Sequence, residues 1–310
     1  MSKKIPRALL LYNPAAPSLR RALPRKLEFV TNAFRIRETV LDTMRIEGPG
    51  HVLASADRVE AKNYDLLIAW GGDGTVNEVG NVAARLDLPL AILPGGTINL
   101  LARELEIPQR LPDAVLLLFD GRLRRIKAGR AGERLFFAVS GAGFDAAVCR
   151  GVNPALKRML GRLAYVARGA RLLFSYRFPT VSVVCDGRGF TGAQAIFSNV
   201  SRYAGNLRLA PLADLAVPTL DLSVLRGDSP GGYVHFFARL LLGRHTRWRE
   251  LTHVKGWTFN ALSNDPVPVH VDGEAGGTLP MRFEAVPDAL QVVAPTGGSP
   301  SPLAPHPSAS

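Results

Sequence analysis

The stretch AWGGDGTVNE at residues 69–78 decides the fold. It joins an apolar run at 65–70 to a helical pattern in which Val76, Val79 and Leu86 share one face. Glycines between a strand and a helix let the main chain take left-handed conformations and let a ligand approach it closely. The free N–H groups at the start of the helix, with the helix dipole behind them, attract anions. The stretch therefore predicts a phosphate-binding loop between a strand and a helix.

The glycine spacing and an aspartate inside this loop limit which kind of phosphate-binding loop it can be. The spacing of the glycines matches neither the P-loop, Gly-x-x-x-x-Gly-Lys-Ser/Thr, nor the dinucleotide fingerprint, Gly-x-Gly-x-x-Gly. A carboxylate at Asp73 repels phosphates unless Mg²⁺ lies between them or the carboxylate handles a proton. The alternative is structural, because an aspartate here can simply cap the following helix.

Two further loops follow the same design. Asn13-Pro14 comes after the apolar run 8–12, and Pro94-Gly95-Gly96-Thr97 comes after the run 88–93. Short strands that alternate with helices predict an open parallel sheet. The carboxyl ends of parallel strands form the ligand crevice of such sheets, so the three loops are expected to converge there.

The second half of the chain has a different pattern. Short strand-like runs separated by turn residues predict an antiparallel, sandwich-like β-rich domain. Two helical segments, 154–174 and 233–243, are inserted in it, and the first carries Leu163, Ala167, Ala170 and Phe174 at helical spacing. The proline- and serine-rich residues 296–310 predict a disordered tail.

These motifs, in this order, are joined by three others in the second half: SGAGFD at 140–145, the segment from Ser198-Asn199 to Ala210-Pro211, and VDGE at 271–274. Together they resemble the diacylglycerol kinase catalytic domain family, whose superfamily includes bacterial lipid kinases and sphingosine kinases. The resemblance covers residues 8 to 294. The Gly-Gly-Asp-Gly-Thr motif alone is less specific, because NAD kinases share it.

The resemblance implies an N-terminal open parallel α/β domain that binds ATP, at residues 1–128, and a β-rich lipid-substrate domain at 129–287. The segment 288–295 is expected to return to the first domain as its last strand. ATP would donate its γ-phosphoryl group to a lipid hydroxyl, with Mg²⁺ carried by the nucleotide. The residues expected around ATP are Asn13, Gly71, Gly72, Asp73, Gly74, Thr75, Asn77, Glu78, Gly96 and Thr97.

The Asp272-Gly273-Glu274 turn supplies two carboxylates, one to take the proton of the hydroxyl and the other to orient it or bind metal. We expect Glu274 to be the general base, with Asp272 as the second choice and Asp73 as the third catalytic carboxylate. The alternative is an ordinary exposed acidic turn between two strands.

One departure from the family pattern concerns metal. Where bacterial members often carry an Asp-Asp-Gly segment that helps to hold a structural Mg²⁺, this chain has Ala216-Val217-Pro218. Apolar side chains cannot ligate Mg²⁺. The sequence therefore predicts that this metal site is absent or is rebuilt from main-chain carbonyls, and the metal ligands stay unknown.

Charge points to an anionic partner. Lysine and arginine number 38 against 26 acidic residues, a net charge of +12, and basic clusters lie near residues 20–26, 122–130, 154–174 and 244–249. Such clusters attract an anionic lipid surface or simply face solvent. No apolar run reaches the roughly 18 residues that cross a bilayer. Together with only two cysteines, this predicts a cytoplasmic protein with peripheral membrane association.

The leading hypothesis is an ATP-dependent lipid kinase that acts on diacylglycerol at a membrane surface. The alternatives are a kinase of sphingoid bases or ceramide, an NAD kinase-like enzyme, and a non-catalytic lipid- or nucleotide-binding relative. Nucleic acid is not an expected partner, because no binding module is recognisable and aromatic residues make up only 7% of the chain. The sequence leaves the oligomeric state open, with a homodimer as one option.

Overall fold

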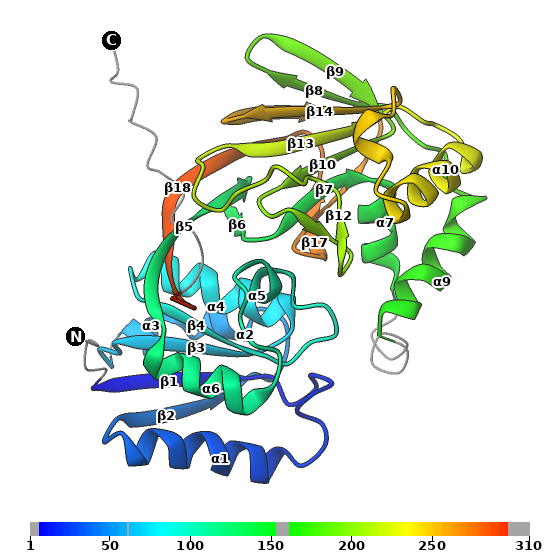
Figure 1. The fold of residues 1–310 in the computed structure, drawn as a ribbon. Coiled ribbons are helices and arrows are strands. Elements are labelled where there is room, and N and C mark those ends of the chain that lie inside the picture. The colour runs from blue at the N-terminus through cyan, green and yellow to red at the C-terminus, as the bar shows by residue number, and fades with distance from the viewer. Residues whose placement is uncertain (1–5, 61, 153–160, 297–310) are drawn as a thin grey trace, which may run out of the picture.

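Four parallel strands form the sheet of the N-terminal lobe in the computed structural model, which describes residues 6–60, 62–152 and 161–296 (Figure 1). In spatial order they are β2 (Val40–Arg45), β1 (Arg7–Tyr12), β3 (Leu66–Gly71) and β4 (Leu90–Pro94). Side chains of β1 alternate, so that Leu9 and Leu11 enter one core and Ala8 and Leu10 enter the other. Both faces of this sheet are therefore buried, as parallel sheets require.

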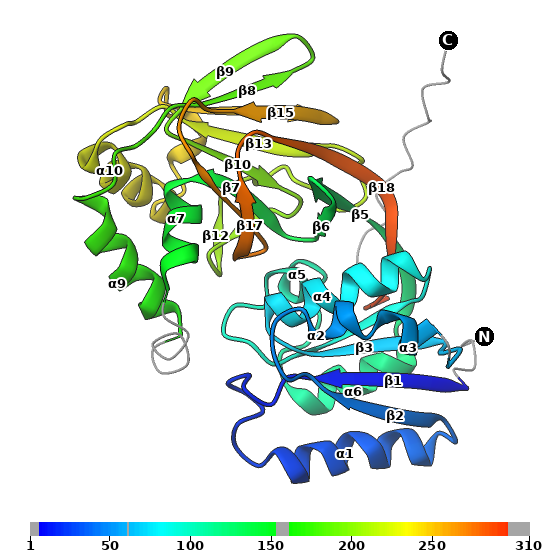
Figure 2. The ribbon, with the colours of Figure 1, turned by 180° about the vertical axis from the view of Figure 1, so that it is seen from behind.

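Helices cover the two faces. On one face lie α1 (Leu23–Ile36) and α6 (Leu111–Asp120). The other face is covered by α2 (His51–Ala54), α3 (Ala56–Glu60), α4 (Asp73–Arg85) and α5 (Leu100–Glu104), as Figure 2 shows from behind. The predicted open parallel α/β domain is confirmed.

The second lobe is an antiparallel sandwich. One layer runs β14 (Leu251–Gly256), β13 (Leu220–Leu225), β10 (Gln194–Ser198), β7 (Val139–Gly143), β16 (Pro268–Val271), β17 (Glu274–Thr278). The other layer contains β15 (Thr258–Leu262), β8 (Val181–Cys185) and β9 (Arg188–Gly192). The rings of Phe197 and Phe283 stack at 3.8 Å between the layers. The predicted sandwich is confirmed.

Helices and a small hairpin lie outside this sandwich. Helices α7 (Phe144–Gly151), α9 (Arg162–Leu173) and α10 (Pro230–Leu241) project from one end of the lobe, followed by the short 3-10 helix η1 (His245–Arg247). Strands β11 (Arg202–Tyr203) and β12 (Leu207–Arg208) pair with each other. Part of the helix expected at 154–174, with Leu156 and Leu160, lies outside the described residues, as does 297–310 of the predicted tail. Among the helices that are described, none is both long and apolar enough to cross a membrane.

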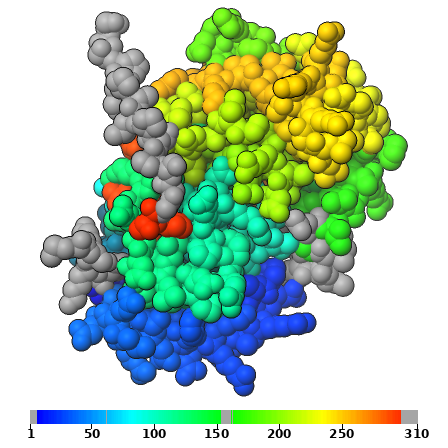
Figure 3. Space-filling model, in the orientation of Figure 1, coloured from blue at the N-terminus to red at the C-terminus, as the bar shows by residue number. Residues whose placement is uncertain are grey.

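Two long strands join the lobes. Strand β18 (Met281–Ala294) pairs with β15 at its start, runs antiparallel to β5 (Arg122–Ala131), and lies parallel to β4 at Val292. The segment predicted to return, 288–295, is thus the end of β18 and the residue after it. Strand β5, which also pairs with β6 (Arg134–Phe136), was missed: the sequence analysis treated it only as a basic cluster. Because ladder partners stabilise it, β5 forms despite its charge. The lobes meet in a continuous surface in Figure 3.

A buried lysine lies on β5 where the chain crosses between the lobes. Lys127 is 2% exposed, and its Nζ donates to the main-chain oxygen of Thr219. Its own main chain donates to Leu215 O (2.9 Å) and accepts from Asn199 Nδ2 (3.1 Å). The carboxylate of Asp221 attracts it. This lysine therefore fixes the segment 215–221 to the strand that links the lobes.

Burial lowers the pKa of Lys127 from 10.5 to about 8. At pH values between these two pKa values, Lys127 keeps its proton in the unfolded chain and has released it in the folded chain. The free energy of unfolding therefore rises with pH in this range. The full shift corresponds to about 3 kcal/mol. We expect wild type to gain this stability relative to Lys127→Met as pH rises from about 8 toward 10. Denaturant titrations at several pH values measure it, and parallel stability profiles for the two proteins would contradict it.

Candidate functional site

The loops after β1, β3 and β4 are hydrogen-bonded into one unit. Gly95 N donates to Gly71 O (2.7 Å), and Ser18 N donates to Gly95 O (3.1 Å). Asn13 N donates to Trp70 O (3.0 Å), so the first loop also joins the second. The convergence expected from the parallel sheet is therefore present at its carboxyl edge.

Close main-chain packing explains the glycines of these loops. A Cβ atom on Gly96 would lie 2.5 Å from Cα of Gly72, and one on Gly71 would lie 2.6 Å from Cβ of Thr75. Thr75 is buried, and its Oγ1 lies 3.5 Å from Nδ2 of Asn13, which donates to it. These five positions, with Gly74, lie together: Asn13, Gly71, Gly72, Gly74, Thr75 and Gly96. Main chain rather than side chains therefore forms most of the surface between the loops.

Helix α4 begins at this point with its first amides uncapped. Its N-cap residue is Gly72, and no side chain caps it. Asp73 does act as a cap, but of the next helix: its carboxylate accepts from Asn99 N (3.1 Å) and Leu100 N (2.6 Å) at the start of α5. Burial raises the pKa of Asp73, and the charge of Asp272 acts in the same direction. Asp73 thus ties the third loop to the second and leaves the amides of α4 available to an anion.

Glu274 reaches this helix start from the second lobe. Its Cδ lies 3.2 Å from the position of a Cβ on Gly74, so its carboxylate rests against the first turn of α4. Arg134 Nη2 donates to Glu274 Oε2 at 2.6 Å. The Glu274 side chain is 29% exposed, so one carboxylate faces the glycine loops and remains open to solvent.

Asp272 has a different environment. Its carboxylate accepts hydrogen bonds from the main-chain amides of Phe137 (2.8 Å), Ala138 (2.9 Å) and Val139 (2.9 Å), and from Asn77 Nδ2 (2.9 Å). Burial raises the pKa of Asp272 while these donors lower it. With four donors around its two oxygens, Asp272 holds the turn in place, a task that the motif did not reveal.

Asn77 and Arg134 connect the lobes. Asn77 is 1% exposed, and its Nδ2 donates to Asp272 and to Leu135 O (2.8 Å). Its Oδ1 accepts from Arg134 Nη2 at 2.6 Å. Arg134 therefore bridges α4 and Glu274. This arginine was not predicted, because it begins the short strand β6 outside every motif and only its contacts distinguish it.

Two of the expected nucleotide residues, Glu78 and Thr97, make other contacts. The carboxylate of Glu78 accepts from the amides of Gly50 and Val52 (3.2 Å), so it caps the short helix α2. Thr97 is exposed at the rim, where its Cγ2 lies 3.3 Å from the position of a Cβ on Gly161 at the start of α9. Thr97 thus marks where the third loop meets the helices of the second lobe.

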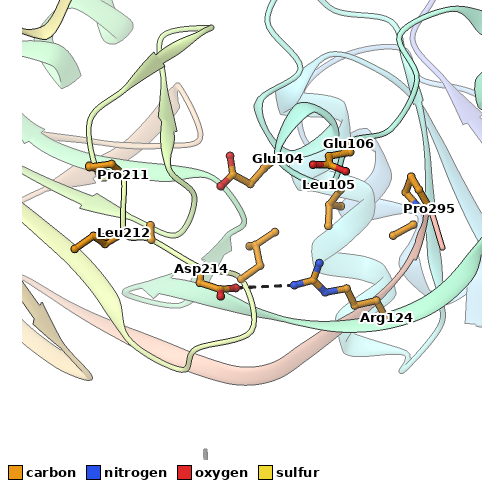
Figure 4. Close-up of a pocket in the computed structure, with 11 residues that line it drawn as sticks. Glu104, Leu105, Glu106, Arg124, Pro211, Leu212, Asp214 and Pro295 are labelled. Atoms are coloured by element: carbon orange, nitrogen blue, oxygen red, sulfur yellow. Dashed lines mark ion pairs between the residues drawn. The ribbon is translucent and has the colours of Figure 1, made fainter. Parts of the chain in front are cut away.

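A cavity of about 470 Å³ lies elsewhere between the lobes (Figure 4). Its walls come from the end of α5, the segment 211–215 and the end of β18, and Arg124 and Asp214 face each other across it at 3.9 Å. None of the expected nucleotide residues lines this cavity. It is therefore a separate feature of the interface.

A resident metal does not fit the described residues. They contain no group of three or more His, Cys, Asp or Glu side chains arranged to hold an ion. The oxygens of Asp73 and Asp272 already accept amide hydrogens. Near Ala216-Val217-Pro218, the ammonium of Lys127 already binds the Thr219 carbonyl. Residues 216–218 thus supply no carboxylate for Mg²⁺, and the Thr219 carbonyl beside them already has a partner.

Comparisons with known proteins agree with this geometry. The family model "Diacylglycerol kinase catalytic domain" matches residues 7–131, and "YegS C-terminal NAD kinase beta sandwich-like domain" matches 138–294. A diacylglycerol kinase of Bacillus subtilis (strain 168) is 30% identical over 294 residues, which cover 93% of this chain and 96% of the relative. The chain belongs to the diacylglycerol kinase family.

Other members of the diacylglycerol kinase family give the same picture. One from Staphylococcus aureus (strain bovine RF122 / ET3-1) is 29% identical over 93% of this chain and 92% of its own length. A crystal structure of a diacylglycerol kinase from Bacillus anthracis superposes with a TM-score of 0.77 at 23% identity, over 95% of this chain and 99% of that one. These structural matches establish the two-lobed fold.

Asp272→Asn is expected to destabilise the protein by roughly 3 kcal/mol, because a neutral amide offers one acceptor oxygen where a carboxylate satisfies four donors. Thermal or urea unfolding measures the loss. Asp288→Asn is the matched control: its backbone has the same left-handed conformation (φ 47° against 48°), but Asp288 is exposed. Equal stability of the two variants would contradict the positioning role of Asp272.

Gly96→Ala is expected to weaken binding of a non-hydrolysable ATP analogue at least about tenfold, because the added Cβ collides with the main chain of Gly72. Isothermal titration calorimetry measures the affinity. Gly189→Ala is the control, since nothing lies within 4 Å of a Cβ added there. Unchanged affinity in Gly96→Ala would mean that the nucleotide binds elsewhere.

Proposed function

We propose that this member of the diacylglycerol kinase family is an ATP-dependent lipid kinase that phosphorylates the hydroxyl of diacylglycerol. The observation that carries the proposal is the contact of Glu274, from the second lobe, with the first turn of α4, where the three loops meet. The names of the relatives support diacylglycerol as the acceptor. Mg²⁺ would arrive with ATP, since the residues that the structure describes contain no group of three or more His, Cys, Asp or Glu side chains to hold it.

Each part of the site has a task in phosphoryl transfer. The main-chain amides of the glycine loops and of α4 bind phosphate oxygens, and the missing side chains let the phosphates approach. The lipid hydroxyl oxygen attacks the γ-phosphorus, the bond from that phosphorus to the bridging oxygen breaks, and ADP leaves with the electron pair. Glu274 accepts the hydroxyl proton, and Arg134 holds its carboxylate in place.

The positions of the other two carboxylates support Glu274 as the base. Asp73 and Asp272 are each enclosed by amide donors, so a proton on either would displace hydrogen bonds that hold loops together. Glu274 has a single charged partner and remains partly exposed. It is therefore the carboxylate that can exchange a proton without disrupting the fold.

The direct test is phosphorylation by the purified chain with labelled ATP and a panel of diacylglycerol, ceramide, a sphingoid base and NAD. We expect label in phosphatidic acid. Label in ceramide or sphingoid phosphate would change the acceptor, and label in NADP alone would overturn the lipid kinase assignment. Affinity for an ATP analogue with no turnover of any acceptor would make the chain a binding protein.

Glu274→Gln is expected to lower kcat for the preferred lipid roughly 100-fold or more, because a general base contributes that much. Its melting temperature should stay near that of wild type, since a partly exposed ion pair contributes about 1 kcal/mol or less. Glu284→Gln is the matched control: Glu284 also pairs with an arginine, Arg130, at 3.0 Å and is 25% exposed. An equal kcat in both variants would remove Glu274 from the chemistry.

A further inference from the structure

The outer face of α9 is apolar. Leu163 and Phe174 are 63% and 81% exposed, and Val166, Ala167 and Ala170 between them are exposed too. At 3.6 residues per turn all five point to one side of the helix. The sequence pattern that would normally mark a buried face is therefore directed away from the protein.

Helix α10 repeats this arrangement. Val234, Ala238, Leu241 and Leu242 are exposed, with Leu241 and Leu242 at 70% and 69%. The opposite side of α10 is packed into the core through Tyr233, Phe236 and Leu240, which are buried. Each helix thus has a packed apolar side and a second apolar side in solvent.

The two exposed stripes belong to one end of the second lobe. Tyr176 and Phe178, just after α9, pack with Tyr233 of α10 in a single aromatic cluster. Figures 1 and 2, seen from opposite sides, both place α9 and α10 at this end, and in Figure 3 their green and yellow surfaces form one edge of the molecule. We call the five α9 residues and four α10 residues named above the docking face.

Arginines outnumber acidic side chains around the docking face, where Asp228 and Glu250 are the exposed acidic residues nearest to α10 in the sequence. Neither α9 nor α10 contains an acidic residue. Arg171, Arg177, Arg244, Arg247 and Arg249 are exposed next to the stripes. Apolar side chains surrounded by arginines match the interface of a bilayer with anionic headgroups, where the apolar groups enter the acyl boundary and the guanidinium groups stay at the phosphates.

The docking face is adjacent to the catalytic cleft. The start of α9 meets the third glycine loop, because Gly161 lies against Thr97. A bilayer on this face would thus lie beside the cleft that needs a lipid. We propose that the docking face binds an anionic membrane surface and so delivers the site to its substrate. The proposal rests on the lipid kinase function, which supplies the reason for a membrane partner.

Vesicle flotation of the full chain tests the proposal, with phosphatidylcholine vesicles that contain or lack phosphatidylglycerol. Wild type should bind the anionic vesicles at least about tenfold more strongly than the neutral ones. The double variants Leu163→Gln/Phe174→Gln and Leu241→Gln/Leu242→Gln should each weaken that binding at least about tenfold. Ile36→Gln/Val40→Gln is the control, because these side chains are 77% and 56% exposed on the N-terminal lobe, and it should bind like wild type.

Kinase assays separate this proposal from the proposed function. On a short-chain diacylglycerol dispersed as monomers, the docking variants should match wild type. If wild type floats through this face but phosphorylates no lipid, the docking face stands and the kinase function fails. The docking proposal is overturned if the docking variants float like wild type, or if sedimentation velocity shows a wild-type dimer that these variants dissociate while vesicle binding is unchanged.

Discussion

The carboxylate of Asp272 accepts hydrogen bonds from three consecutive amides of the second lobe and from Asn77 on α4, so it spans the boundary between the lobes. Enclosed charges are stable only when such donors surround them, and losing one partner leaves a costly buried anion. The turn that carries Asp272 cannot shift relative to α4 without breaking this set. Glu274, two residues later, is therefore held against Gly74 by a constraint that it does not itself provide.

The site proposed to bind a triphosphate must compensate the negative charges of its own carboxylates. Three carboxylates lie near the start of α4, and each has a separate source of compensation. The carboxylate of Asp73 accepts hydrogen bonds from the first amides of α5, and that of Asp272 accepts from four donors. The carboxylate of Glu274 accepts from Arg134. The first amides of α4 are left without a side-chain cap. Positive potential from the helix end thus remains directed at the space between the loops.

Local patterns predicted much of this arrangement. Turn residues after apolar runs, Asn-Pro after β1 and glycines after β3 and β4, identified the ends of these strands, because a strand must leave a parallel sheet at its carboxyl edge. Such patterns could not predict the role of each carboxylate. Whether Asp73 caps α4 or α5, and whether Asp272 or Glu274 stays open to solvent, depends on partners up to 195 positions away in the chain. Arg134 carried no signal for the same reason.

Strand β5 shows a second limit of local patterns. Its first residues are mostly arginine, which favours an exposed loop, yet nine of its positions pair with β18. The hydrogen bonds to β18, and not the pattern of its own side chains, make β5 a strand. The two strands could have been predicted together only if the antiparallel pairing of β18 with β5 had been known.

Helix α9 shows why periodicity predicts a face but not its environment. Leu163, Ala167, Ala170 and Phe174 gave a regular apolar stripe, which in most helices marks the side that packs. Here Ala164, Tyr165 and Leu172, on another side, make the contacts with the protein. A helix with apolar residues on two sides can satisfy only one of them within its own fold. The second side then requires either a cost in exposed area or an external apolar phase, and the membrane surface proposed above would supply such a phase.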